Sequence, residues 1–172
     1  MKTFRRAFAA GLSALALSAM MLAAGSAAPA SAAPLNAKLE AHHSGKCLDV
    51  ATASQADGAF VHQWECYPAA NQNWTLTSLG DGYYKVSADH SGKCLDVAEA
   101  SQADGGKVHQ WHCYDTPNQE WKLVQRPNGY LTLVARHSGK CLEIAGGGIY
   151  NGTGAVQQTC DAGRPYQEWR LL

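Results

Sequence analysis

The stretch His43–Trp74, HSGKCLDVATASQADGAFVHQWECYPAANQNW, occurs again 47 residues later as HSGKCLDVAEASQADGGKVHQWHCYDTPNQEW over His90–Trp121. A third, more divergent copy runs from His137 to Trp169 and keeps HSGKCLEIAGGG, AVQQTC and YQEW. A repeat of this length is one supersecondary unit that cannot bury its apolar face alone, so the copies must pack on one another. We therefore expect the function to reside in the repeat.

The first 32 residues have the composition of a secretory signal. A positive start (Lys2, Arg5 and Arg6) precedes an apolar run, and a small-residue cleavage site ends at Ala32. A transmembrane anchor is the alternative, which is disfavoured because Gly and Ser interrupt the run and no second apolar segment follows. We predict a signal peptide over 1–32, one domain over 33–172, and a secreted, extracellular protein without membrane insertion.

The charge balance argues against nucleic acid as a partner. Removing the signal takes away three basic and no acidic residues, which turns 14 basic and 14 acidic side chains into 11 and 14. The mature chain then has no basic stripe that could neutralise phosphates. Its length suits one compact domain, which we expect to be a monomer that needs no cofactor.

Six cysteines occur as one pair per copy, and the members of each pair are 19 positions apart. This constant spacing favours one disulfide inside each copy over the other pairings that six cysteines allow. Zinc binding is the competing use, but no copy has the short C-x₂₋₄-C spacing of a zinc site, and an exported protein can form disulfides. We expect no metal site and the disulfides Cys47–Cys66, Cys94–Cys113 and Cys141–Cys160.

Short apolar segments separated by turn signals fill each copy, and no window sustains a helical period. Asp81-Gly82 and Asn128-Gly129 lie between copies, and a Ser-Gly dipeptide recurs inside each, as is typical of tight turns. Three copies of about four strands give about twelve strands around a pseudo-threefold axis. The sequence therefore predicts an all-β fold, a β-trefoil, with repeats over about 39–78, 83–125 and 130–172.

Strand alternation turns Asp49 away from the core. If the bonded cysteines of repeat one lie directly opposite each other in an antiparallel pair, Asp49 faces Trp64. The same construction places Asp96 near Trp111. A carboxylate beside an indole outside the core predicts a binding site in each of the first two repeats.

The copies share a pattern of C-L-D-V (C-L-E-I in the third), a residue two positions before the second cysteine that is aromatic in two copies, and N-Q-x-W or Y-Q-x-W. This pattern resembles the ricin B-chain type lectin family, and it is similar to the trefoil carbohydrate-binding modules attached to bacterial glycosidases. The resemblance covers nearly all of the mature chain. It implies a β-trefoil with up to three shallow sugar sites, and it leans toward galactose-type or xylan-type ligands.

The chemistry of the residues suits a sugar, which offers rim hydroxyls and a face of C–H groups. The aspartates can accept hydrogen bonds from adjacent hydroxyls, and the indoles can stack on the C–H face. The asparagines can donate an amide N–H to the sugar, and the glutamines can hold the aspartate or the loop. The predicted carbohydrate-binding residues are Asp49, His62, Trp64, Asn71, Gln72, Asp96, His109, Trp111, Asn118 and Gln119.

Each of these residue types has a structural alternative. The two indoles could pack in the core, as we expect for the tryptophans at 74, 121 and 169, which recur in all three copies. The aspartates and the Asn-Gln pairs could instead fasten turns. The histidines stand where many members of that family have glutamine, so they could be solvated side chains at the rim, or they could make binding change in mild acid.

Repeat three has lost most of this pattern. Glu143 replaces the aspartate, Gln158 stands where a stacking ring is expected, and Tyr166 replaces the asparagine. Compared with the other two copies, we expect one residue fewer between Val156 and Cys160 and one more in the triple-glycine loop. In the alternative that this repeat binds sugar, Tyr150 would serve as a substitute platform. Retention of a histidine before the Ser-Gly turn in all three copies favours a turn or packing role for it.

The sequence favours a secreted, non-catalytic carbohydrate-binding protein that uses repeats one and two. A glycosidase is the first rival, but such enzymes need two carboxylates at a set separation, and each predicted platform has one. The second rival is a trefoil protein-binding module such as a protease inhibitor, since fold does not fix function. An accessory binding subunit of a secreted glycosidase remains a further alternative.

Overall fold

The computed structural model describes residues 33–172, and the predicted signal peptide lies outside the described residues. Strands and short 3-10 turns make up the regular structure. The strands are β1 (Leu35–Ala37), β2 (Leu39–Ala41), β3 (Cys47–Val50), β4 (Ala59–Trp64), β5 (Trp74–Gly80), β6 (Tyr83–Ala88), β7 (Cys94–Val97), β8 (Gly106–Trp111), β9 (Glu120–Gln125), β10 (Leu131–Ala135), β11 (Cys141–Ile144), β12 (Ala155–Gln158) and β13 (Trp169–Leu171). The 3-10 turns are η1 (Ala51–Ala53), η2 (Ala70–Gln72), η3 (Ala98–Ala100), η4 (Pro117–Gln119), η5 (Ala145–Gly147) and η6 (Pro165–Gln167).

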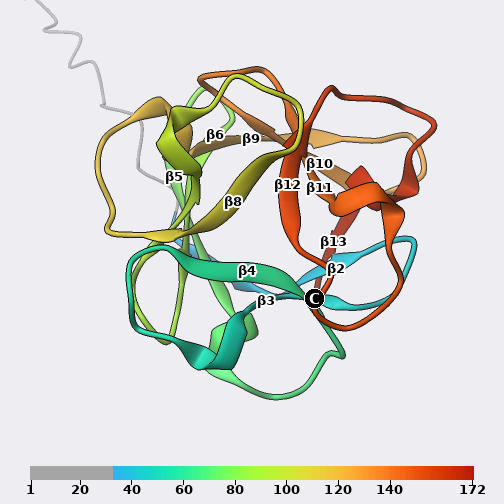
Figure 1. The fold of residues 1–172 in the computed structure, drawn as a ribbon. Helices are drawn as coiled ribbons and strands as arrows, with labels where there is room; N and C mark the ends of the chain where they lie inside the picture. Colours follow the sequence, from blue (N-terminus) through green and yellow to red (C-terminus); the bar gives the residue numbers. More distant parts are fainter. Residues whose placement is uncertain (1–32) are drawn as a thin grey trace, which may run out of the picture. The chain divides into compact units, whose positions relative to one another are not determined.

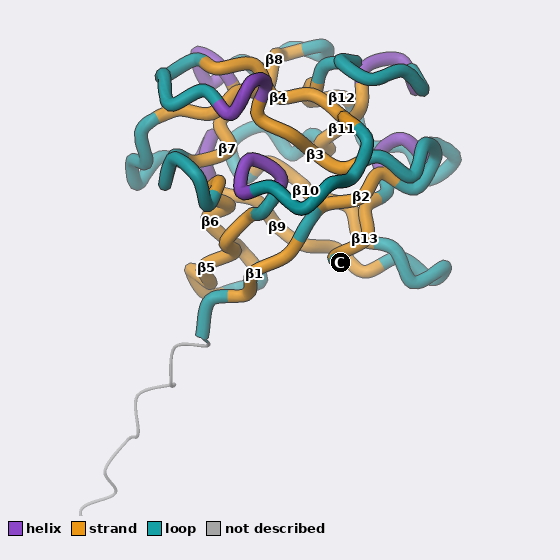
Figure 2. Tube along the Cα trace, turned by 90° about the horizontal axis from the view of Figure 1, so that it is seen from below, coloured by secondary structure: helices purple, strands orange, loops and turns teal. Residues whose placement is uncertain are grey.

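The strands form a β-trefoil, as the repeat predicts. β4 pairs with β8, β8 pairs with β12, and a single bridge from His62 to Gly154 closes the ring between β12 and β4. Figure 1 looks down the pseudo-threefold axis, and these three strands surround its centre. Figure 2 shows them in one tier, with β1, β5 and β13 in the tier at the other end. Residues 33–172 contain 13 strands rather than about twelve, because the short β1 adds to the edge of β5.

The core lies between the repeats and holds one tryptophan from each. Trp74, Trp121 and Trp169 are fully buried, as predicted. Each indole N–H donates to the carbonyl of a buried leucine, at 3.1, 2.9 and 3.2 Å. The bond satisfies the polar group that a buried tryptophan carries into the core, so the ring can fill space among the aliphatic side chains without an unpaired donor.

The three predicted disulfides are present. Each joins cysteines 19 positions apart, with Cα atoms 5.0 to 5.1 Å from each other. The first cysteine lies on a buried strand, and the second follows the end of the next strand. The bond therefore ties a strand to the loop that carries the Asn-Gln pair in repeats one and two and Tyr166-Gln167 in repeat three.

The extra residue of repeat three is not where the sequence suggests. β11 pairs with β12 through Glu143 and Val156, which keeps the spacing of the other two copies up to Cys160. The expected deletion before Cys160 and insertion in the glycine loop are therefore wrong. The additional residue lies between Cys160 and Gln167, since seven positions separate these residues and six separate their counterparts. Residues 33–172 contain no helix with the length and hydrophobicity of a membrane span.

The histidines before the Ser-Gly turns connect neighbouring repeats. His90 Nε2 donates to the carbonyl of Ser54 at 2.9 Å, and Gln110 Nε2 donates to the same carbonyl at 2.7 Å. The hydroxyl of Ser91 donates to the side-chain oxygen of Gln110 and fixes that amide. Matching bonds recur at the other two boundaries, so each repeat holds the loop of the preceding one in place.

Candidate functional site

The register of β3 and β4 places His62 opposite Asp49. Cys47 pairs with Trp64, and Asp49 pairs with His62, so the predicted pairing of Asp49 with Trp64 is wrong by two positions. The error arises because Cys66 lies in the loop beyond β4, where the disulfide bridges a diagonal rather than an opposed pair. Repeat two has the same register, with Asp96 opposite His109.

Each aspartate is buried and held by a histidine and two amides, and the Tyr67 hydroxyl also donates to Asp49 Oδ2 at 3.4 Å. In repeat one, His62 Nε2 lies 2.9 Å from Asp49 Oδ1, while the amides of Asn71 and Gln72 donate to Oδ2 at 3.0 and 2.9 Å. Asp49 is 2% exposed. The predicted role of the glutamine in holding the aspartate agrees with this geometry. A carboxylate fixed in this way is a preorganised acceptor for one or two further donors.

Repeat two repeats the cluster. His109 Nε2 lies 3.0 Å from Asp96 Oδ1, and Asn118 and Gln119 donate to Oδ2 at 3.0 and 2.7 Å. The second hydrogen of the Asn118 amide goes to the carbonyl of Val97. Both amide hydrogens are therefore directed to the protein, and the group that Asn118 offers to a ligand is its side-chain oxygen. The expected donation from this amide to a sugar does not fit this geometry.

The tryptophans two positions before the second cysteines lie outside the core. Trp64 is 40% exposed and Trp111 is 38% exposed. Each indole stacks on the preceding histidine, with ring centroids 5.5 and 5.3 Å apart. The histidine thus bonds to the aspartate on one side and supports the indole on the other, which links the acceptor to the flat apolar surface.

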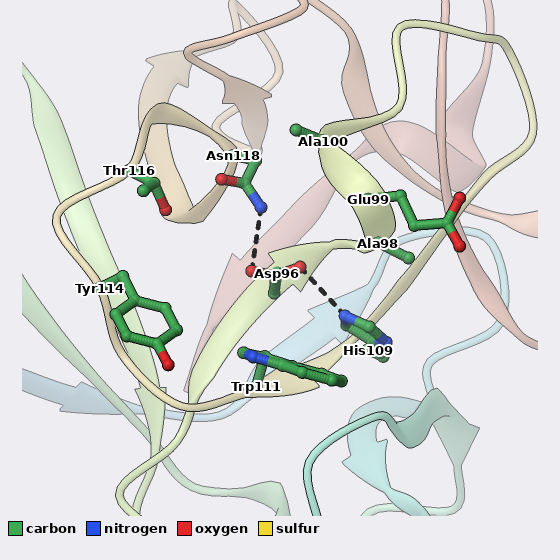
Figure 3. A pocket seen from close by; sticks show the side chains of 9 residues that line it. All are labelled: Asp96, Ala98, Glu99, Ala100, His109, Trp111, Tyr114, Thr116 and Asn118. Carbon is green, nitrogen blue, oxygen red and sulfur yellow. Dashed lines mark hydrogen bonds and ion pairs between the residues drawn. The ribbon is translucent and has the colours of Figure 1, made fainter.

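A pocket of about 490 Å³ opens over this cluster in repeat two. Figure 3 shows Asp96 at its centre with Trp111 below, between one wall that contains Tyr114 and another that contains η3. The lining residues are Asp96, Ala98, Glu99, Ala100, His109, Trp111, Tyr114, Thr116 and Asn118. Sequence reasoning missed Tyr114, Thr116 and the η3 residues. The tyrosine that follows the second cysteine in the first two repeats only was a signal for one of them.

The η3 wall is a strained turn. Glu99 and Ala100 have φ of 56° and 47°, and Thr52 and Ala53 of repeat one have 56° and 50°. Residues with a Cβ rarely adopt this left-handed region, and such strain concentrates at functional sites. Ala98, Glu99 and Ala100 of this turn form one side of the pocket.

The two sites differ in their tyrosines and in nearby charge. The Tyr67 hydroxyl donates to Asn71 Oδ1 at 3.2 Å, and Lys38 Nζ donates to the Tyr67 carbonyl at 2.8 Å. Burial lowers the pKa of Lys38, and the nearby charge of Asp49 partly opposes this. The matching Lys85 instead bonds to Asp115, and this hydrogen bond lowers the pKa of that carboxyl. In site one, the ammonium of Lys38 therefore lies close enough to Asp49 to interact with its charge. In site two, the matching ammonium is paired with Asp115 instead.

In repeat three, a tyrosine ring fills the space next to the turn η5, which corresponds to the η3 wall of repeat two. The ring of Tyr166 lies where a side chain at residue 147 would be, since a Cβ added to Gly147 would meet that ring at 2.8 Å. Glu143 is buried, accepts from Gln167 at 2.7 Å, and lies 3.6 Å from the guanidinium of Arg164. Gln158 accepts a hydrogen bond from the Gly105 N–H. In repeat three, Gln167 and Arg164 therefore contact the carboxylate, and the Tyr166 ring fills the space next to Gly147.

Comparison with known proteins agrees with this architecture. A model of the ricin-type beta-trefoil lectin domain matches residues 36–169. The designed threefold-symmetric protein ThreeFoil is 47% identical, with a TM-score of 0.78 over 80% of this chain and 97% of that one. An exo-beta-1,3-galactanase, 1,3Gal43A from Clostridium thermocellum, is 36% identical with a TM-score of 0.75, over 80% of this chain but only 30% of that one.

The hemolytic lectin CEL-III is 26% identical, with a TM-score of 0.66 over 80% of this chain and 30% of that one. The match to the family model spans all three repeats and both aspartate clusters. Together with the lectin neighbours it supports a carbohydrate-binding role. The chain belongs to the family of ricin-type β-trefoil lectin domains.

Proposed function

We propose that the protein is a secreted, non-catalytic lectin that binds sugars in repeats one and two, while repeat three is closed. The observation that carries the proposal is the duplicated cluster in which a buried, triply bonded aspartate lies next to a half-exposed indole. Repeat three keeps the fold, including its disulfide and core tryptophan, but Gln158 stands in place of the indole and the Tyr166 ring lies against Gly147.

In this proposal the sugar stacks its C–H face on the indole and directs hydroxyls toward the carboxylate. Asp96 Oδ1 has one protein donor, so it can accept from a hydroxyl above the Trp111 ring. The free oxygen of Asn118 accepts a second hydroxyl, and the Tyr114 ring at the pocket wall adds apolar contact. The carboxylate needs no rearrangement on binding, because His109 and the two amides already hold it.

The site favours binding over hydrolysis. In the first site Asp49 is the acidic residue of the cluster, and a histidine and two amides hold it as an acceptor. A glycosidase needs one carboxyl that gives a proton and another that attacks or activates water. In the second site Glu99 also lines the pocket, but repeat one has Thr52 at that position. We expect no release of reducing ends from xylan or galactan.

The sugar class that we propose is a galactose-type or xylan-type polysaccharide. The similarity to part of an exo-beta-1,3-galactanase favours β-1,3-galactan as one probe, and it supports the second candidate function, an accessory module that binds substrate for such an enzyme. Each shallow site alone should be weak. Two sites on one scaffold gain avidity on a polymer that can reach both.

A depletion assay tests the proposal. Residues 33–172 are mixed with insoluble β-1,3-galactan, xylan and cellulose, and the protein left in solution is measured. We expect depletion by galactan or xylan for the wild-type protein and for the Glu143→Gln variant, and little for Asp49→Asn combined with Asp96→Asn. Undiminished depletion of the double variant would show that the clusters do not bind sugar, and equal depletion by all three polymers would contradict the proposed preference for galactan or xylan.

Export through a cleaved signal peptide over residues 1–32 is part of the proposal. Three disulfides are compatible with an oxidising compartment outside the cytosol. The mass of the protein recovered from culture medium tests this directly. We expect a chain that starts near residue 33 and carries no free thiol, whereas full-length protein retained in cells would contradict it.

A further inference from the structure

The loop before each platform strand contacts the platform of the next repeat. Asp57 in repeat one accepts a hydrogen bond from the backbone N–H of His112 at 2.9 Å, directly after Trp111. Gly58 N–H donates to the carbonyl of Gln110, directly before that indole. The backbone of repeat two is therefore held on both sides of Trp111 by two adjacent residues of repeat one.

The same loop lies against the indole itself. A Cβ built on Gly58 would lie 3.4 Å from Trp111 Cζ3 and 4.0 Å from the ring of His109. Gly58 has a φ of 78°, a conformation that favours glycine. Because glycine has no side chain, nothing separates the loop from the ring at this point. The loop is fixed in turn by Lys93, whose ammonium lies 2.6 Å from Asp57 and, by this hydrogen bond, lowers the pKa of the carboxyl.

The arrangement is cyclic around the pseudo-threefold axis. Asn151 of repeat three accepts from the N–H of Glu65 at 3.1 Å, directly after Trp64. Asp104 of repeat two accepts from the N–H of Thr159 at 2.8 Å, where repeat three has Gln158 in place of an indole. Asp104 also pairs with Lys140 at 2.6 Å, which matches the pairing of Asp57 with Lys93.

We infer that Asp57 and Asn151 are positioning residues for the sugar platforms of the following repeats, an inference that rests on the proposed function of those sites. Site two is completed by repeat one, and site one is completed by repeat three. This assigns a task to the closed repeat: it binds no sugar itself and orients Trp64. Asn151 acts through its side-chain oxygen, which accepts from the N–H of Glu65.

The test is a crossover of three alanine variants in two backgrounds. Asp49→Asn removes the charged acceptor of site one, so that binding measured in this background reports on site two. Asp96→Asn removes the charged acceptor of site two, so that binding measured in that background reports on site one. Affinity for soluble galactan and xylan oligosaccharides is measured by titration in each. We expect Asp57→Ala to weaken site two alone and Asn151→Ala to weaken site one alone, by about three- to tenfold, which is the size of an aromatic contact.

Asp104→Ala is the matched control, because it removes the same kind of ion pair and backbone bond where no platform ring follows. A loss of affinity with Asp104→Ala as large as with Asp57→Ala would overturn the inference, because the loops would then act only through general stability. Equal weakening of both sites by either positioning variant would overturn it as well.

A second readout needs no sugar. The indole N–H resonance of Trp111 is expected to shift on Asp57→Ala and on Gly58→Asn, and to stay in place on Asp104→Ala and on Gly105→Asn. Gly58 and Gly105 share a φ of 78°, which asparagine tolerates, but only Gly58 has the ring within 4 Å. If neither background binds sugar, the proposed function fails while this measurement still decides the inference. An unmoved Trp111 signal would refute the positioning role.

Discussion

Replacing Asp96 by asparagine isolates the charge of one site from its shape. In the protein, two amides donate to Asp96 Oδ2 and His109 Nε2 lies 3.0 Å from Oδ1. Asparagine can keep its oxygen toward the two amides and present its NH₂ to the histidine. The ring can then change tautomer and accept through Nε2, so the cluster and the fold persist. What is lost is the charged acceptor that faces the ligand.

The size of the loss follows from the hydrogen bonds concerned. A bond to a charged group contributes roughly 1 to 1.5 kcal/mol more than a neutral one, which corresponds to about tenfold in affinity for each sugar hydroxyl on Asp96. The assay is a calorimetric or NMR titration with galactose and xylo-oligosaccharides in the Asp49→Asn background. Adding Asp96→Asn should weaken the remaining site about tenfold with little change in melting temperature. An unchanged affinity would refute the role given to the carboxylate.

Two further outcomes are expected. Trp121→Ala should destabilise the protein by about 3–5 kcal/mol in urea unfolding, and a smaller cost would show that the ring is not a core anchor. Lys93 lowers the pKa of Asp57, so the contribution of this carboxylate is present above the unfolded value of about 3.9 and is lost as pH falls through the lower folded value. The stability difference between wild type and Asp57→Asn should accordingly persist at pH 5–8 and shrink as the pH is lowered below about 3.9.

The repeat made most of the fold predictable. A constant period, constant cysteine spacing and recurring turn dipeptides lead to a β-trefoil with three internal disulfides, and the structure has both. The grouping of aspartate, asparagine and glutamine also followed, because their types recur together in two copies. The core role of Trp74 and its counterparts was accessible for the same reason.

The register was not accessible from the cysteines. A Cα separation of 5.0 Å between Cys47 and Cys66 can be met by residues directly opposite each other or by a strand residue and one in the adjoining loop, and the sequence does not distinguish these. The second arrangement occurs, which brings His62 rather than Trp64 opposite Asp49. The histidine, which we predicted to be a carbohydrate-binding residue, consequently has a more central place in the site than the solvated rim position of the alternative.

The strained turns and the contacts between repeats were also hidden. Thr52 and Glu99 adopt left-handed backbone although neither is glycine, and only repeat three marks the turn by residue type, with Gly146 and Gly147 at the matching positions. The bond from His112 to Asp57 spans 55 positions and exists only because the barrel closes. Such contacts depend on the packing of whole repeats, which a pattern within one repeat does not encode.

The most direct test of the two-site account is an NMR titration of residues 33–172 that follows the indole N–H signals of the five tryptophans. Soluble galactan or xylan oligosaccharides are added, with cellobiose as the comparison. The account predicts that the signals of Trp64 and Trp111 shift in a saturable way, and that those of the three buried tryptophans do not. A titration in which neither exposed indole responds, or in which repeat three responds as strongly as the other two, would contradict it.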